Sequence, residues 1–128
     1  MRLLLDTHVF LWAAGPEARL SQRAGALIAD SGNMVHVSIA TLWEIAIKVS
    51  ARKLRFDPSR FATMVQSLNF QVLSIDVPHC VEAANLPLHH RDPFDRMMVA
   101  QARVEGLTLV TADRTLARYD VPLLSATD

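Results

Sequence analysis

The chain has 128 residues, of which 51% are hydrophobic and 20% charged, a balance typical of a compact globular domain rather than a disordered one. Thirteen basic residues balance thirteen acidic ones. Because this gives no global positive field, a nucleic-acid partner would need a local basic patch, a metal ion or a partner chain. The length predicts a single domain over residues 1–128.

The cysteine content and the apolar runs indicate the cellular compartment of the protein. A lone cysteine excludes an intrachain disulfide, and Cys80 lies in a helical stretch where a small buried residue is expected. The run Leu3-Leu4-Leu5 stops at Asp6 and is too short for a signal peptide. No run is long enough to cross a bilayer. We therefore expect a cytoplasmic protein without a membrane partner.

Short apolar strands alternate with helices along the whole chain. Strands are expected at residues 2–5, 34–37, 70–75, 107–111 and, as an edge strand, 121–124. Helices are expected at about 7–14, 38–51, 76–85, 92–105 and 113–119, with two more opening at Ser21 and at Asp57-Pro58. The first helix should end near Gly15-Pro16. This alternation predicts an α/β fold with a mostly parallel central sheet of four or five strands and helices on both faces.

Acidic residues stand where such a fold places its ligands. In open α/β sheets, ligands bind beyond the carboxyl ends of the strands. Asp6 directly follows the first strand, and Asp113 follows the fourth after a short interval. Glu44 and Asp95 lie early in two helices that this topology can bring alongside. The sequence therefore offers four carboxylates for one crevice.

The chemistry gives clustered carboxylates a reason to exist. They repel one another, and one is often forced neutral unless a cation joins them. Mg²⁺ prefers carboxylate and water oxygens, and one or two such ions can activate a water and stabilise the charge on a reacting phosphodiester. Asp and Glu without Cys or paired His ligands fit Mg²⁺ or Mn²⁺ better than Zn²⁺.

Each acid also has a purely structural interpretation. The acids that follow strands can cap the helices after them. Asp92 and Asp95 resemble a capping box, and Glu44 can pair with Lys48 one turn later. Local patterns leave both interpretations open. Candidate contacts to an RNA backbone, which can equally be solvated surface, are Lys48, Arg52, His90, Arg91 and Arg96.

Four segments, in order along essentially the whole chain, carry a family resemblance. They are Leu3-Leu4-Leu5-Asp6-Thr7-His8, Ser38-Ile39-Ala40-Thr41-Leu42-Trp43-Glu44-Ile45-Ala46, His90-Arg91-Asp92-Pro93-Phe94-Asp95-Arg96 continuing into Val99-Ala100-Gln101-Ala102, and Leu109-Val110-Thr111-Ala112-Asp113. With these segments the chain resembles the PIN domain family and, within it, the VapC-like toxins. The resemblance implies a three-layer α/β/α PIN-like fold.

The resemblance also implies a site and an activity. Asp6, Glu44, Asp95 and Asp113 match a catalytic quartet around Mg²⁺ or Mn²⁺, in which Asp6, Asp95 and Asp113 hold the metal and Glu44 acts through water. The residues implied beside the metal are Thr7, Ser38, Asp92 and Thr111. The implied reaction is hydrolysis of RNA by a metal-activated water, without a covalent intermediate. The implied partners are a small cognate antitoxin and a second copy of the chain.

Three rival classes share parts of this pattern. A phosphatase with an aspartyl nucleophile usually has a second Asp two residues after the first, where this chain has His8. A phospho-receiver domain needs an acidic pair near the first strand and a Lys after a late one, and neither is present. A PIN-like module that only binds RNA or protein remains the main alternative, although clustered acids would be costly for it to keep.

Overall fold

The central sheet is entirely parallel. The computed structural model describes residues 1–15 and 19–127. Its five strands lie in the order β3-β2-β1-β4-β5. They are β1 (Arg2–Leu5), β2 (Met34–Ser38), β3 (Gln71–Leu73), β4 (Thr108–Thr111) and β5 (Leu123–Ser125). The predicted α/β sheet is confirmed, with the last strand at an edge as expected.

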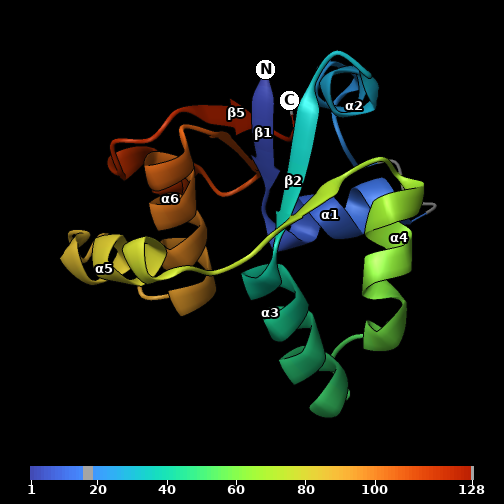
Figure 1. Ribbon diagram of the computed structural model, residues 1–128, viewed down its shortest axis with the longest axis horizontal. Helices are drawn as coiled ribbons and strands as arrows, with labels where there is room; N and C mark the ends of the chain where they lie inside the picture. The colour runs from blue at the N-terminus through green and yellow to red at the C-terminus, as the bar shows by residue number, and fades with distance from the viewer. Residues whose placement is uncertain (16–18, 128) are drawn as a thin grey trace.

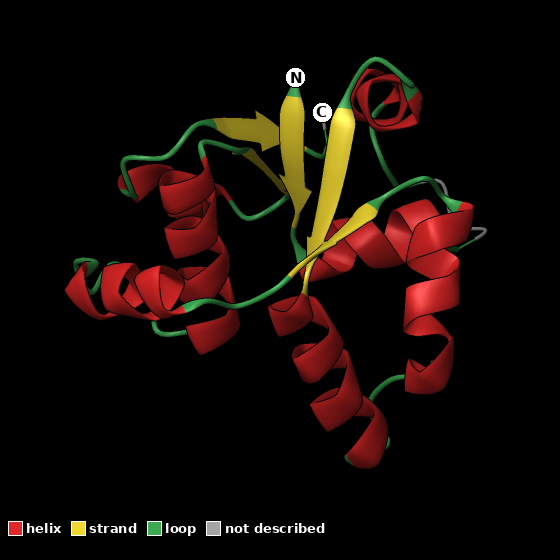
Figure 2. Ribbon diagram, viewed as in Figure 1, coloured by secondary structure: helices red, strands yellow, loops and turns green. Residues whose placement is uncertain are grey.

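Helices cover both faces of this sheet. They are α1 (Thr7–Ala14), α2 (Gln22–Ala29), α3 (Ile39–Ser50), α4 (Phe61–Ser67), α5 (Val77–Asn85) and α6 (Pro93–Glu105), with 3-10 turns η1 (Pro58–Arg60) and η2 (Arg114–Arg118). Figure 1 shows α5 and α6 on one side of the strands and α1, α2 and α4 on the other. Figure 2 shows the same three layers as strands between two groups of helices. Among the described helices, none is long and apolar enough to cross a membrane.

The central strand explains why the chain begins with an apolar run. Successive side chains of a strand point to opposite faces, so a strand covered on both faces is apolar throughout. Leu3 and Leu5 pack in the cluster that includes Phe10 of α1, whereas Leu4 packs in the cluster that includes Met98 of α6. The two hydrophobic layers therefore meet at β1.

Register brings the ends of three strands to one edge of the sheet. Leu5 pairs with Val37 of β2 and with Val110 of β4. The Asp6 backbone N–H then donates to the Val110 carbonyl at 3.0 Å. Because α1 and α3 start directly after β1 and β2, their first turns lie at the same edge.

Most predicted helix boundaries are confirmed by their capping hydrogen bonds. The Ser21 hydroxyl accepts from the Ala24 N–H, and Ser38 accepts from Ala40. Asp57 opens η1 rather than an α-helix, so α4 starts later than its predicted cap. The helix α1 ends at Ala14, and the Pro16 part of the predicted stop lies outside the described residues.

The expectation of a buried Cys80 is wrong. Cys80 is exposed on α5, as are its neighbours Val77 and Val81. The helix forms the outer layer of the molecule and packs on α6, with His79 as its buried residue. The apolar residues around Cys80 therefore belong to a helix with one exposed face and not to a helix enclosed by the core.

Gly106 and Gly25 provide a matched test of the backbone argument. Gly106 ends α6 with φ of +68°, where an L side chain is strained, so Gly106→Ala should lower the free energy of unfolding by about 1 kcal/mol. Gly25 lies inside α2, and a Cβ there meets nothing within 4 Å, so Gly25→Ala should raise it by roughly 0.5 kcal/mol. Urea unfolding measures both. Equal stability of the two variants would contradict the assignment of Gly106 as a left-handed helix cap.

Candidate active site

A cavity of about 420 Å³ brings the four predicted acids together. It opens at the sheet edge where β1 and β4 end. The lining residues are Asp6, Thr7, His8, Trp12, Glu44, Lys48, His90, Asp92, Asp95, Ala112 and Asp113. The acids come from the end of β1, from α3, from α6 and from the end of β4, so the tertiary fold assembles this cluster.

Asp6 is a helix cap and a member of the cluster at once. One carboxylate oxygen accepts from the Val9 N–H at 3.0 Å, which confirms the capping prediction. The other accepts from the Thr111 hydroxyl at 2.5 Å. Burial raises the pKa of Asp6 above its usual range, and the Thr111 hydrogen bond offsets part of that rise. Asp6 therefore has a structural role, and each of its carboxylate oxygens keeps a lone pair that is available to a ligand.

Glu44 is buried and held by two donors. Its Oε1 accepts from the Thr7 hydroxyl at 2.6 Å, and its Oε2 accepts from Lys48 Nζ at 2.8 Å. The Thr7 hydroxyl also lies 3.2 Å from that of Thr41. The predicted pairing of Glu44 with Lys48 is thus confirmed. Lys48 faces the acid cluster and neutralises part of its charge.

Asp95 is the acid that the protein compensates least. Burial, then the negative charges of Asp92 and Asp6, raise the pKa of Asp95 to about 7. Asp92 caps α6 by accepting from the Phe94 and Asp95 N–H groups, as predicted. The capping box itself is wrong, because the Asp92 N–H donates to His90 Nδ1 and not to Asp95. The Asp95 carboxyl is therefore left facing the cavity.

Asp113 is bound on both of its oxygens. Oδ1 accepts from the Thr115 N–H at 2.9 Å and from its hydroxyl at 2.7 Å, and Oδ2 accepts from His90 Nε2 at 3.0 Å. Burial raises the pKa of Asp113, but the hydrogen bonds from Thr115 and His90 outweigh it and hold the pKa below its usual value. The Asp113 N–H donates to the Thr111 hydroxyl, so Thr111 links the two strand-end acids.

The other predicted residues divide into those that touch the acids and those that do not. Thr7, Thr111 and Asp92 border the cluster, as just described. Ser38 contacts none of the four acids: its hydroxyl donates to Gln101 Oε1 at 2.6 Å and caps α3. Sequence reasoning missed Gln101, since a buried Gln in an apolar helix carries no local signal for its partner.

The candidate RNA contacts are also placed differently from one another. Arg52 and Arg91 are exposed. Arg96 is already committed to the protein, because its guanidinium donates to the carbonyls of Ala83, Leu86 and Pro87 and to the Tyr119 hydroxyl oxygen. His90 faces Asp113 and Asp95 rather than solvent, with Nε2 3.6 Å from Asp95 Oδ2.

The donor chemistry of the cluster fits a hard divalent cation. Ligand atoms of His90, Asp95 and Asp113 lie within 4.8 Å of one another, and Asp6 lines the same cavity. Carboxylate oxygens dominate the set, and two of the acids have raised pKa values that a cation would relieve. Such a set suits Mg²⁺ or Mn²⁺.

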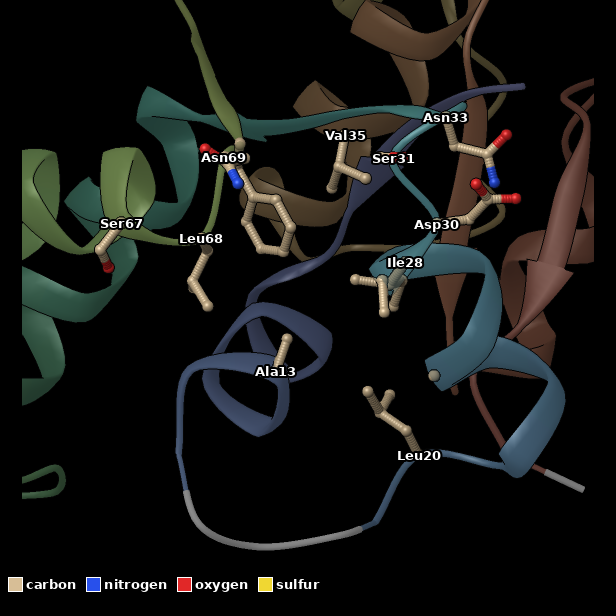
Figure 3. Close-up of a pocket in the computed structure, with 13 residues that line it drawn as sticks. Ala13, Leu20, Ile28, Asp30, Ser31, Asn33, Val35, Ser67, Leu68 and Asn69 are labelled. Carbon is tan, nitrogen blue, oxygen red and sulfur yellow. The ribbon is translucent and has the colours of Figure 1, made fainter.

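A larger cavity of about 650 Å³ lies elsewhere and has a different character. Figure 3 shows it between α1, α2 and the end of α4, with Leu20, Ile28 and Leu68 reaching into it. Asp30 is the one acid among the described residues that line it. The described lining of this larger cavity is mainly apolar, whereas the smaller cavity gathers the four predicted acids, so the size of a cavity does not identify the candidate site.

The raised pKa of Asp95 predicts how stability depends on pH when no metal is bound. A carboxyl with a folded pKa of about 7 binds its proton more tightly than in the unfolded chain, where the pKa is about 3.9. The free energy of unfolding should therefore fall as the pH rises from about 4 to about 7. Urea unfolding in EDTA measures this slope. Asp95→Asn should flatten this slope, and an unchanged slope in that variant would contradict the assignment of the raised pKa to Asp95.

Comparison with known proteins finds a similar sequence and several solved structures with the same fold. Ribonuclease VapC22 of Mycobacterium tuberculosis is 28% identical over 123 residues, covering 94% of this chain and 93% of that protein. VapBC2 from Rickettsia felis, solved bound to a promoter DNA fragment, has a TM-score of 0.73 at 16% identity over 98% of each chain. VapBC-5 from Mycobacterium tuberculosis has a TM-score of 0.63 at 22% identity, over 99% of this chain and 98% of that one.

The family itself is decided by the match in sequence. The model of the PIN domain family matches residues 3–122, which spans the strands and helices that carry all four acids. The chain belongs to the PIN domain family.

Proposed function

We propose that this protein, as a single PIN domain over residues 1–128, is a metal-dependent endoribonuclease that hydrolyses RNA phosphodiester bonds. The observation that carries the proposal is the meeting of four carboxylates in one cavity at the carboxyl edge of a parallel sheet. The 28% identical relative is a ribonuclease by name, which supports RNA as the substrate.

Mg²⁺ or Mn²⁺ is the cation that the cavity would take. Asp6, Asp95 and Asp113 would hold it, and Glu44 would act through a water. When bound, the ion supplies a water of lowered pKa and neutralises charge on the phosphate under attack. The raised pKa values of Asp6 and Asp95 support this, because burial and neighbouring negative charge disfavour the ionised carboxylates and a cation would offset both effects.

The chain's own residues prepare the cavity by fixing the acids. Thr111 orients Asp6 through its hydroxyl, and Thr7 and Lys48 hold Glu44. Preorganised groups need no rearrangement when charge develops in the reaction. These donors come from the end of β4, from the first turn of α1 and from the last turn of α3, and the core holds all three elements in place.

The RNA backbone would meet a limited set of basic residues. Lys48 and Arg96 already donate to acceptors within the protein. Arg52 and Arg91 are exposed, and they are the cations that we propose to contact phosphates. The balanced net charge agrees with such local binding.

We further propose that the protein is the toxin of a toxin–antitoxin pair. Solved structures similar to it include VapBC proteins, one of which is described as a member of a family of toxin–antitoxin systems. A small cognate antitoxin is therefore the proposed protein partner, with a homodimer or a hetero-oligomer as the assembly. A cytoplasmic site of action follows from that role.

An RNA cleavage assay tests the nuclease. Purified protein should cut RNA with Mg²⁺ or Mn²⁺ and not in EDTA. Asp6→Asn and Asp95→Asn should each lower the rate by more than about 100-fold. Substituting a residue that only hydrogen-bonds to a metal ligand already lowers activity by about 10- to 100-fold. Asp30→Asn is the matched control, because Asp30 is exposed directly after α2 and an amide oxygen can keep its hydrogen bond from the Gly32 N–H.

Two outcomes would contradict the proposal. Cleavage that survives EDTA and both site variants would exclude this site as its source. RNA binding without cleavage, in folded protein that has bound Mn²⁺, would instead favour the non-catalytic PIN-like module.

A further inference from the structure

His90 points an N–H donor at two of the four acids. Its Nδ1 accepts from the Asp92 backbone N–H at 3.1 Å. Because a neutral imidazole carries one proton, an accepting Nδ1 leaves that proton on Nε2. Nε2 lies 3.0 Å from Asp113 Oδ2 and 3.6 Å from Asp95 Oδ2. The ring therefore donates to Asp113 from a place beside Asp95.

The same tautomer separates His90 from the metal-ligand set. A histidine binds a metal through a nitrogen lone pair, and Nε2 here carries hydrogen. Moving the proton to Nδ1 would set it against the Asp92 N–H and break that hydrogen bond. His90 thus falls within 4.8 Å of the ligand atoms of Asp95 and Asp113 without being suited to replace one of them.

Asp113 depends on His90 for the direction of one oxygen. Thr115 holds Oδ1 through two hydrogen bonds, but the side chain is 37% exposed and Oδ2 receives its hydrogen bond from His90. Without that donor the carboxylate is held on one oxygen and can turn toward solvent. With it, Oδ2 is kept on the side of Asp95.

The loop that carries His90 is anchored and not merely in contact with the site. The His90 backbone N–H donates to the Tyr119 hydroxyl oxygen at 3.0 Å. Arg96 of α6 donates to the same oxygen at 3.1 Å and to the Pro87 carbonyl at 2.9 Å. Leu86, at the start of the loop, is buried in the core layer beside α6. The contacts of Tyr119, Arg96 and Leu86 thereby fix the position of His90 relative to the acids.

We propose that His90 is a positioning residue of the nuclease site, whose Nε2–H holds Asp113 beside Asp95 so that the two carboxylates can take up one cation. This role differs from a contact to the RNA backbone, which was the expectation from sequence. The effect on turnover rests on the proposed nuclease function, whereas the effects on metal binding and on the tautomer do not.

Two substitutions separate the two hydrogen bonds of the ring. His90→Gln can present an amide N–H near the place of Nε2, whereas His90→Asn offers an oxygen to the Asp92 N–H but is too short to reach Asp113. His89→Asn is the matched control, because His89 is exposed, packs edge-on against the Tyr119 ring at 5.2 Å and lies outside the cavity lining.

The expected pattern is a loss that the longer amide rescues. His90→Asn should lower kcat on RNA, and the affinity for Mn²⁺, by about 10- to 100-fold with little change in KM. His90→Gln should recover most of both, and His89→Asn should match the wild type. Nitrogen NMR of the metal-free protein should show the His90 proton on Nε2.

Each contrary result bears on the proposal and not only on the nuclease. A wild-type kcat and Mn²⁺ affinity in His90→Asn, a rise in KM alone, or a proton on Nδ1 would each overturn it. If the wild type cleaves no RNA, the Mn²⁺ titration still decides: weaker binding in His90→Asn upholds the positioning role while the nuclease proposal fails, and unchanged binding rejects that role.

Discussion

Repulsion between carboxylates at one edge of the sheet is the constraint around which the rest of the site is arranged. Because β1 and β4 are adjacent and parallel, Asp6 and Asp113 end up at the same edge, and α3 and α6 add two more acids. Burial strengthens the repulsion by removing water. The protein supplies compensating donors from Thr111, Lys48 and His90. Asp95 still keeps a pKa near 7, so the compensation is incomplete and a divalent cation would complete it.

The compensating donors are held in place by the hydrophobic layers. Thr111 ends β4, whose side chains fill both layers of the core, and Lys48 follows Glu44 by one turn of a helix that starts at β2. A hydrogen bond from Ser38 to Gln101 links the start of α3 to α6, which opposes independent shifts of the helices that carry Glu44 and Asp95. The geometry of the acids is thus a property of the packed fold rather than of any one loop.

Sequence reasoning succeeded where the signal is local. Apolar runs, capping residues and strand-end acids each show in a few neighbouring positions, and they predicted the sheet, most helix starts and the acid cluster. The predicted third strand was too long because β2 ends at Ser38 to start α3, which leaves β3 without a partner beyond Leu73. The roles of His90 and Arg96 were missed, because their partners are an acid 23 residues away and backbone carbonyls that no sequence pattern marks.

Calorimetric titration with Mn²⁺ in two buffers of different ionisation enthalpy, near pH 6.5, tests most directly whether a cation relieves the repulsion. If Asp95 holds its proton until the metal arrives, binding should release protons, and the apparent enthalpy should differ between the buffers. The Asp95→Asn variant should bind more weakly and release fewer protons. Absence of binding, or binding with the same enthalpy in both buffers, would contradict the account.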